Sequence, residues 1–294
     1  MEFFFSLLIA GISVGSAYAL IALGLNMTFW TTRTLNFGQG SLMMLCAMLT
    51  SIIATQGVSL ALGAVGALLI VGALGVFIER FTVRPALRIE GSMGWIVSTL
   101  GFGIFLQGMA AKYFGSQAVA FPEILFSATD IVTIAGVHVA LQYLVILVLA
   151  VVLIAGLELF LRKTIWGQVI RAVSSDPELG RVQGMPVRHI ILLSFVASSV
   201  LAGIAGLLTA QIGGTVDPAF GFDLVLLGFV AAVLGGMGSS VGALVGGIVV
   251  GVLSKFVGGY VSSAAEHGIA FALLMLMLAV RPQGLFTRPE AVKA

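Results

Sequence analysis

The sequence is short of charged residues. Of its 294 residues only 9% are Asp, Glu, Lys or Arg, and 60% belong to the set AVILMFWYC. A soluble domain carries about 25% charged residues because its surface must be compatible with water, so that class is excluded. The 14 basic and 12 acidic residues leave a net charge of +2, too small and too scattered for a nucleic-acid surface. The sequence therefore predicts an integral membrane protein.

Residues that carry enzyme chemistry are equally scarce. The single cysteine, Cys46, cannot form an internal disulfide. The three histidines are far apart and form no His-Glu-x-x-His motif, which favours interfacial side chains over a metal site. None of the four lysines follows a glycine, so the Gly-x-x-x-x-Gly-Lys-[Ser/Thr] phosphate loop is missing. We predict no metal, no cofactor and no enzymatic activity for this chain.

Long uncharged runs locate the membrane spans, because a charge at the bilayer centre is costly and a helix needs about 20 apolar residues to cross. The runs are residues 3–32, 34–78, 91–111, 131–157, 189–216, 224–254 and 268–280. The second holds two helices with a turn near Gln56, and the sixth is interrupted at residues 235–240. We predict an all-α, polytopic helical bundle with about nine hydrophobic segments, eight to nine of them spans. Residues 1–294 form a single domain in this interpretation.

Basic residues predict the orientation, because Lys and Arg are enriched in cytoplasmic loops. Twelve of the 14 Lys and Arg residues lie in four segments: the loop that contains Arg33, residues 80–88, residues 162–188 and the C-terminal tail from Arg281. The other two are Lys112 and Lys255. The opposite loops carry acidic residues instead. An odd number of crossings, with the N-terminus outside and the C-terminus cytoplasmic, satisfies every loop.

The interiors of the runs contain no ionisable side chain that could couple transport to an ion gradient. The nearest are Glu158 and Lys255. Glu158 precedes Arg162 by four residues, which predicts an ion pair at the cytoplasmic end of a helix. Lys255 is expected to extend its ammonium group to the outer interface. Energy for transport would therefore have to come from another subunit.

The longest polar segment between spans, about residues 162–189, is predicted to contain two short helices. The apolar stripe of the first comprises Ile165, Trp166, Val169, Ile170 and Val173. Asp176 followed by Pro177 is typical of the start of a second helix, which Gly184 and Pro186 end. An exposed apolar face favours docking on a partner protein. The alternative is that both helices lie flat on the lipid headgroups.

Two glycine-rich polar breaks, residues 36–41 and 211–218, predict a route for a solute, because interrupted helices at membrane depth are tolerated where they face a cavity. Ser98 and Thr99 form a weaker third position. The predicted substrate pathway comprises Asn36, Gln39, Ser98, Thr99, Gln211 and, near the outer gate or docking surface, Asp217. The alternative is that both breaks are capped loops and that the two hydroxyls bond the preceding turn.

Small residues at four-residue intervals, namely Gly238, Gly242 and Gly246, predict close helix packing. The packing partner is either another helix of the same chain or a second subunit.

Six stretches, in order, resemble the permease subunits of branched-chain amino acid ABC importers. They are residues 35–40, 79–85, 98–101, 167–172 with Asp176, 231–239 with Gly242, and 281–286. The similarity spans nearly the whole chain and most resembles the first of the two related permeases. The family often has Ala and Glu where this chain has Gly38 and Ser41, so a carboxylate-dependent role is not carried over to position 41.

The resemblance implies an importer subunit of a bacterial inner membrane that carries leucine, isoleucine or valine by alternating access. Its partners would be a homologous permease in a heterodimer, two cytoplasmic ATPase subunits that use the ATP, a periplasmic substrate-binding protein and membrane lipid. Residues 162–189 then match the coupling segment, with Trp166, Gly167, Arg171, Asp176 and Gly184 in ATPase coupling. The alternatives are a permease or passive pore for urea, short amides or other small neutral solutes, and a scaffold, which would have no use for the polar breaks.

Overall fold

A computed structural model describes residues 2–87, 93–123, 130–134, 137–262, 265–281 and 284–286. Within these residues the chain is mostly helical. The apolar helices are α1 (Glu2–Thr32), α2 (Gln39–Thr55), α3 (Leu60–Phe77), α5 (Gly94–Phe114), α6 (Leu141–Lys163), α9 (Val187–Gly213), α10 (Phe220–Gly235), α11 (Ser240–Tyr260) and α12 (Ala265–Val280). Six of them, α1, α3, α5, α6, α9 and α11, are long and apolar enough to cross a membrane, whereas α2, α10 and α12 are shorter.

The helical bundle is thus confirmed, and two predicted interruptions lie where expected. A turn at Gln56 and Gly57 separates α2 from α3, and residues 236–239 separate α10 from α11. After α3 the chain continues into a π-helix, η1 (Ile78–Val83), and the short α4 (Arg84–Ala86). The number of crossings stays a prediction, because three of the helices are too short to span by length alone.

Two short pairs of strands, which the all-α prediction did not include, add to the helices of the described residues. β1 (Val119–Ala120) pairs with β4 (Thr215–Val216), and β2 (Ile131–Ile134) pairs with β3 (Val137–Ala140), both antiparallel. The uncharged run 131–157 therefore begins with a hairpin, and α6 starts only at Leu141. The run was longer than one crossing needs, and its first residues are largely β-branched, which favours extended backbone.

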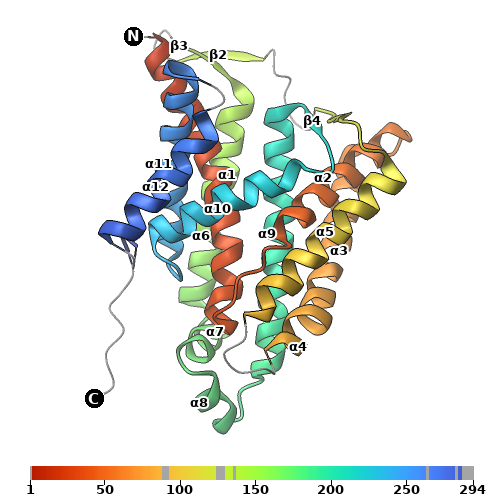
Figure 1. The fold of residues 1–294 in the computed structure, drawn as a ribbon, viewed down its shortest axis with the longest axis vertical. Helices are drawn as coiled ribbons and strands as arrows, with labels where there is room; N and C mark the ends of the chain where they lie inside the picture. The colour runs from red at the N-terminus through yellow and green to blue at the C-terminus, as the bar shows by residue number, and fades with distance from the viewer. Residues whose placement is uncertain are drawn as a thin grey trace.

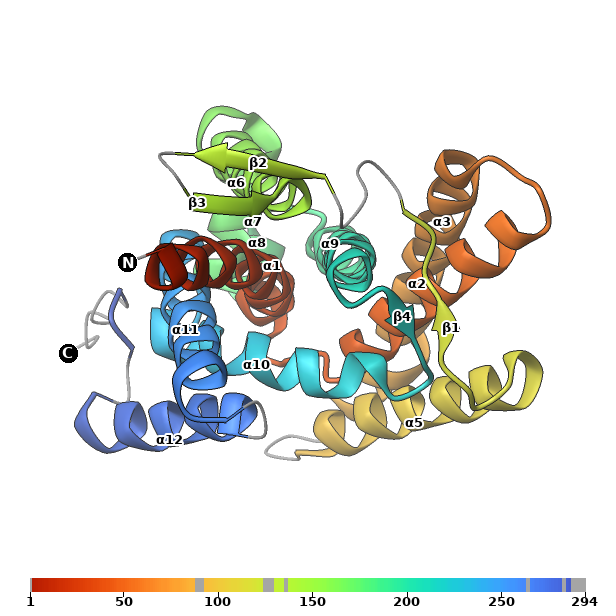
Figure 2. The same ribbon diagram turned by 90° about the horizontal axis from the view of Figure 1, so that it is seen from above.

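Helix α1 forms the centre of the bundle. It runs for about 45 Å and contacts α6, α9, α10 and α11. Every residue from Ser13 to Thr28 is buried, as expected of a helix that is apolar on all sides. Figure 2 shows α5, α10 and α12 along one side of this arrangement. The hydrophobic core extends from α1 into α2, where the lone cysteine, Cys46, is completely buried.

Glycines allow the helices of the core to pack backbone to backbone. A Cβ atom on Gly15 of α1 would lie 2.6 Å from the carbonyl oxygen of Gly247 in α11. A Cβ on Gly242 or Gly246 would meet the backbone of α10 at Gly235 or Ala231. The predicted glycine contacts are therefore made between helices of the same chain, and Gly238 serves the turn instead, with φ +90°.

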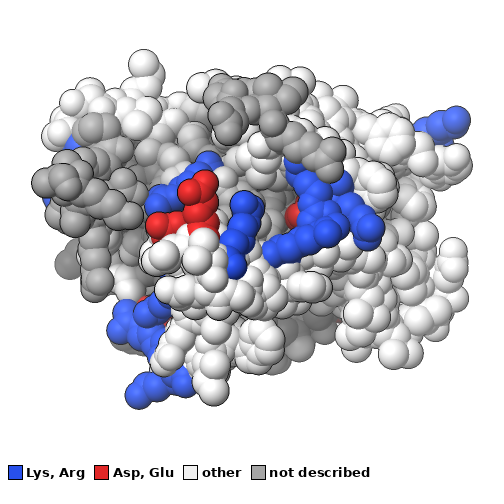
Figure 3. Space-filling model, turned by 90° about the horizontal axis from the view of Figure 1, so that it is seen from below, with Lys and Arg blue, Asp and Glu red and all other residues white. Residues whose placement is uncertain are grey.

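The two ends of the bundle differ in charge. The β2–β3 hairpin and the start of α1 lie at one end, and two short helices, α7 (Ile165–Ser175) and α8 (Pro177–Val182), lie at the other. Figure 3, which views the α7–α8 end, shows Lys and Arg side chains gathered there with few acidic ones. Near the opposite end, Lys255 of α11 pairs with Glu266 of α12 at 2.6 Å.

Candidate functional site

The first polar break, residues 33–38, connects α1 to α2. It starts at Arg33, which has φ +56° and so ends α1 in a left-handed conformation that non-glycine residues rarely adopt. Asn36 and Gln39 are both completely buried. Gln39 Nε2 donates a hydrogen bond to the carbonyl oxygen of Ile21 at 3.2 Å. Its Oε1 atom and both polar atoms of the Asn36 side chain have no hydrogen-bond partner among the described residues.

Unpaired buried amides are costly, at about 1 to 3 kcal/mol for each unsatisfied group. Three such atoms lie within four residues of one another at this break. The arrangement suits side chains that receive their partners only when the helices around them move. Neither side chain lines the groove described below, so the role of Asn36 and Gln39 on a solute pathway stays a prediction.

Helix α5 brings Thr99 next to this break. A Cβ atom on Gly38 would lie 3.0 Å from the carbonyl oxygen of Thr99 and 3.1 Å from Asn36 Oδ1. The Thr99 hydroxyl, however, donates to the carbonyl of Trp95 at 2.8 Å, and the Ser98 hydroxyl donates to Thr82 of η1 at 3.2 Å. The Thr99 hydroxyl thus bonds the preceding turn, as the alternative interpretation predicted. The Ser98 hydroxyl does so only in part, because it reaches the carbonyl of Trp95 at 3.3 Å as well as that of Thr82 in η1.

Gln211 and Asp217 lie apart from Asn36. Gln211 is close to the end of α9 beside β4, and Asp217 lies in the turn before α10. Asp217 Oδ1 accepts a hydrogen bond from the backbone N–H of Ala219 at 2.7 Å. The predicted pathway residues therefore do not form one cluster. Asn36, Gln39 and Thr99 gather at the first break, whereas Gln211 precedes β4 and Asp217 follows it.

A groove between α2, α5 and α10 is lined by Asp217 at one end, whereas the other predicted pathway residues, Asn36, Gln39, Ser98, Thr99 and Gln211, do not line it. It consists of two adjoining hollows that share Ile104, Gln107 and Pro218. The inner hollow is lined by Phe37 and Ser41, and the outer one, about 490 Å³, by Asp217. Gln107 is a groove residue that sequence reasoning missed. The signal was a lone amide within the apolar run of α5.

The interruption predicted at residues 235–240 is the turn of residues 236–239 between α10 and α11. We call it the second break from here on; it is distinct from residues 211–218 and is held by α1. Asn26 is completely buried. Its Oδ1 accepts from the backbone N–H of Gly238 at 3.1 Å, and its Nδ2 donates to the carbonyl of Ser239 at 3.2 Å. Trp30 Nε1 donates to the carbonyl of Gly238 at 2.7 Å. Ser239 caps α11 by accepting from the N–H of Gly242 at 3.0 Å. Asn26 and Trp30 were not predicted as site residues.

The segment 162–189 folds as predicted. Helix α7 is capped by Thr164, whose Oγ1 accepts from the N–H of Gly167 at 3.0 Å. Asp176 caps α8 by accepting from the N–H groups of Glu178 and Leu179 at 3.1 and 2.9 Å. Gly184, with φ +76°, lies in the turn that follows α8.

The apolar residues of α7 are buried at one end of the helix and exposed at the other. Val173 is buried against Val187 and Ile190 at the start of α9. Ile165 and Trp166, in contrast, are 79% and 59% exposed. A Cβ on Gly167 would lie 2.5 Å from the carbonyl oxygens of α6 at Phe160 and Leu161, so glycine allows α7 to pack onto α6. The exposed pair leaves an apolar surface at the basic end of the bundle.

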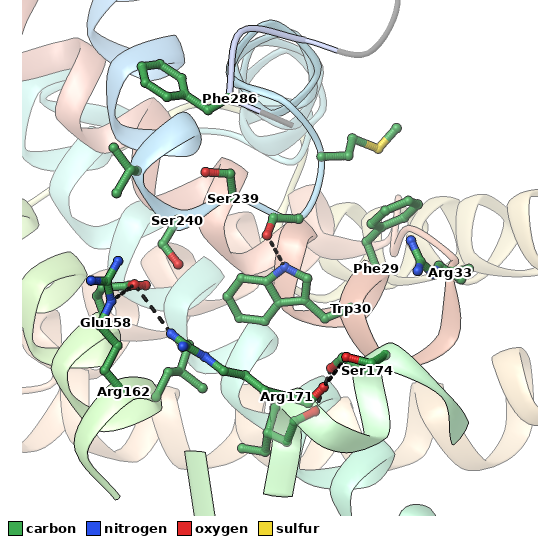
Figure 4. A pocket seen from close by; sticks show the side chains of 16 residues that line it. Phe29, Trp30, Arg33, Glu158, Arg162, Arg171, Ser174, Ser239, Ser240 and Phe286 are labelled. Atoms are coloured by element: carbon green, nitrogen blue, oxygen red, sulfur yellow. Dashed lines mark hydrogen bonds and ion pairs between the residues drawn. The ribbon is translucent and has the colours of Figure 1, made fainter. Parts of the chain in front are cut away.

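A cavity of about 520 Å³ lies between α7 and the second break and is lined by residues of α1, α6, α7 and α11. Figure 4 shows Glu158 in this cavity with Arg162 and Arg171 pointing toward it. Glu158 Oε1 lies 2.6 Å from Arg162 Nε and 3.5 Å from Arg171 Nη2. The predicted ion pair between Glu158 and Arg162 is confirmed, and Arg171 joins it from the next helix.

Comparison with known proteins identifies the family. Residues 7–280 match the family described as branched-chain amino acid transport system, permease component. The chain belongs to this family. It is 33% identical, over 99% of its length and 98% of the relative, to the high-affinity branched-chain amino acid transport system permease protein LivH of Salmonella typhimurium. It is 32% identical to BraD of Pseudomonas aeruginosa, a protein with the same description, over 97% and 96% of the two chains.

A solved structure supports the fold. The PsaBC complex from Streptococcus pneumoniae with a Fab contains a chain that matches with a TM-score of 0.51 and 15% sequence identity. The match covers 96% of this chain and 93% of that one. The family model and the curated relatives confirm the family predicted from the six sequence stretches. The solved structure shows that the overall arrangement of helices is shared with a chain of that complex.

Proposed function

We propose that this chain is the membrane-spanning permease subunit of an ATP-binding-cassette importer for branched-chain amino acids, working by alternating access. The observation that carries the proposal is the nearly full-length similarity to permeases named for high-affinity branched-chain amino acid transport. The uncharged spans agree with it, because a system without an internal coupling charge must draw energy from partner subunits.

The proposed partners are two cytoplasmic ATPase subunits, a homologous permease in a heterodimer and a periplasmic substrate-binding protein. ATP is used by the ATPases, and this subunit needs no cofactor. The exposed Ile165 and Trp166 on α7 supply an apolar surface suited to the ATPases. The basic end of the bundle would face the cytoplasm of a bacterial cell, with the N-terminus outside and the inner membrane around the bundle.

In the proposed transport cycle the solute passes along the groove between α2, α5 and α10. Asp217 lines its outer hollow, and Gln211 is proposed to act near the same end. Asn36 and Gln39 are buried, but their sequence neighbours Phe37 and Gly40 line the inner hollow. The solute would enter when α2, α5 and α10 separate and expose the unpaired amides. A zwitterionic amino acid offers both donors and acceptors to such side chains, and its alkyl group suits the apolar groove wall.

Uptake by the reconstituted complex tests the function. The permeases, ATPases and binding protein are placed in vesicles, and uptake of radiolabelled leucine is measured with ATP or with a non-hydrolysable analogue. We expect uptake that requires ATP, the binding protein and the ATPases together. Uptake that persists unchanged without the ATPases would identify a passive pore and contradict the proposal. Radiolabelled urea serves as the matched solute control and should not accumulate.

A further inference from the structure

One carboxylate joins the ends of three helices at the basic end of the bundle. Glu158 of α6 pairs with Arg162 on its own helix and with Arg171 on α7. Ser240, the first residue of α11, lines the same cavity, and its hydroxyl lies beside the Glu158 side chain in Figure 4. The Glu158 side chain is 22% exposed, which leaves it at the edge of the cavity in Figure 4.

Arg171 is the inward contact of α7. Its side chain extends into the cavity toward Glu158, whereas Trp166 on the same helix is mostly exposed. The link spans 3.5 Å and the Arg171 side chain is 51% exposed. An ion pair of this kind is weak enough to lengthen and re-form during repeated movements of α7.

Ser240 connects the carboxylate to α10. It directly follows the break that Asn26 and Trp30 hold, and α10 precedes that break. The backbones of α10 and α11 touch at Gly235 and Gly242, so the two helices cannot shift independently there. The opposite end of α10 contributes Gly221 and Phe222 to the groove.

We propose that Glu158 is a positioning residue that ties α7 to the α10–α11 junction, so that movement of α7 displaces the groove-lining helix α10. This inference rests on the proposed function, because it requires ATPases that move α7. It assigns Arg171 to a relay within the permease in addition to any contact it makes with an ATPase. Glu158 touches no solute and acts through its neighbours.

The test is the number of solute molecules transported per ATP hydrolysed by the complete reconstituted complex. Glu158→Gln keeps the size and the Ser240 contact but removes the charge that Arg171 requires. We expect this ratio to fall about fivefold while ATP hydrolysis continues. Arg171→Gln should give the same fall, and the double variant should be no worse than either single one. Arg80→Gln, which removes an exposed charge of η1 at the same end, is the matched control and should keep the wild-type ratio.

Two further variants serve as controls, which distinguish loss of the relay from misfolding and from loss of ATPase binding. Ser240→Ala leaves the Ser239 cap intact and should lower the ratio, although less than Glu158→Gln. Exchanging the charges, Glu158→Arg with Arg171→Glu, should restore part of the lost ratio. Such a rescue would show that the interaction between the two side chains, and not a separate role of either one, sustains the ratio. Co-purified ATPase should stay at the wild-type amount in each variant.

The relay is overturned if Glu158→Gln and Ser240→Ala both keep the wild-type ratio, or if the effects of Glu158→Gln and Arg171→Gln multiply in the double variant. Wild-type vesicles that show no ATP-dependent uptake would instead refute the proposed function, and the relay with it. Wild-type uptake with an unaltered ratio in the variants refutes the relay alone.

Discussion

A buried asparagine lies at each of two breaks, Asn36 at the α1–α2 break and Asn26 beside the α10–α11 break, and the two differ in their hydrogen bonds. Asn26 is buried and spends both polar atoms of its carboxamide on the backbone of the α10–α11 break. Asn36 is equally buried, and neither polar atom of its carboxamide has a partner among the described residues. We call the α10–α11 break the permanent joint, because the Asn26 side chain is fully paired there. We call the α1–α2 break the moving part, because the polar atoms of Asn36 are available to bond a new partner when the helices shift.

Their surroundings reinforce the difference. The α10–α11 break is also held from the far end of the chain, because the N–H groups of Leu285 and Phe286 donate to the carbonyls of Leu234 and Gly235, each at 3.0 Å. The α1–α2 break is held by the close backbone contact of Gly40 with Gly221 and by hydrogen bonds that include Gln39 N–H to the Asn36 carbonyl at 3.2 Å and the Ser41 hydroxyl to the Gly103 carbonyl at 2.8 Å. We expect movement at the first break before the second, because the first retains buried side-chain atoms without a partner among the described residues.

The largest expected effect comes from adding bulk at the permanent joint. Gly242→Val would force a side chain into the backbone of α10 at Gly235, which cannot move aside. We expect destabilisation by about 3 kcal/mol or more. Thermal melting and size-exclusion chromatography of the detergent-solubilised protein measure it. Gly101→Ala, at a position with open space around it, is the control and should melt like the wild type.

Next in size is the contrast between the two asparagines. Asn26→Ala leaves the N–H of Gly238 and the carbonyl of Ser239 unpaired and should cost about 2 kcal/mol of stability. Asn36→Ala removes groups that are already unpaired, so the protein should keep its melting temperature but lose most of its ATP-driven leucine uptake. Both quantities are measured for both variants. Equal melting temperatures for the two would contradict the distinction between joint and moving part.

The smallest expected effect concerns the cap of α11. Ser239→Ala removes the hydroxyl that accepts from the N–H of Gly242, and loss of such a cap costs about 1 kcal/mol. Thermal melting should detect a small decrease, with leucine uptake per ATP largely retained. A loss of transport as large as that of Asn36→Ala would show that the second break is itself a moving part.

Features set by neighbouring residues were predictable from the sequence. The cap at Asp176 and the glycine at position 184 follow from local backbone chemistry, and the structure contains both. The ion pair of Glu158 with Arg162 was likewise predictable, because residues four apart share one helix face. The interruption before α11 was apparent from its run of glycines.

Contacts between distant segments were not predictable in this way. Asn26 and Gly238 are 212 positions apart, and nothing near Asn26 in the sequence indicates its partner. A lone amide in a long apolar run is a signal that such a partner exists, yet only the packing of α1 on α11 identifies it. The same holds for Arg171 and Ser240, which meet at Glu158 from two different helices.

The β2–β3 hairpin was missed for another reason. Absence of charge marks a segment as compatible with lipid but does not distinguish a helix from two short strands. The groove was not predicted from the sequence. Glycines and polar side chains indicated the breaks at residues 36–41 and 211–218, whereas Gln107 comes to line the groove through the packing of α5 on α2.

The complete burial of Cys46 inside α2 makes the natural chain suited to spectroscopy. A water-soluble maleimide has no path to that sulfur, so a second thiol introduced at an exposed position such as Trp166 would be labelled selectively. Pairs of spin labels or fluorophores attached in this way could follow α7 during turnover without first removing the native cysteine.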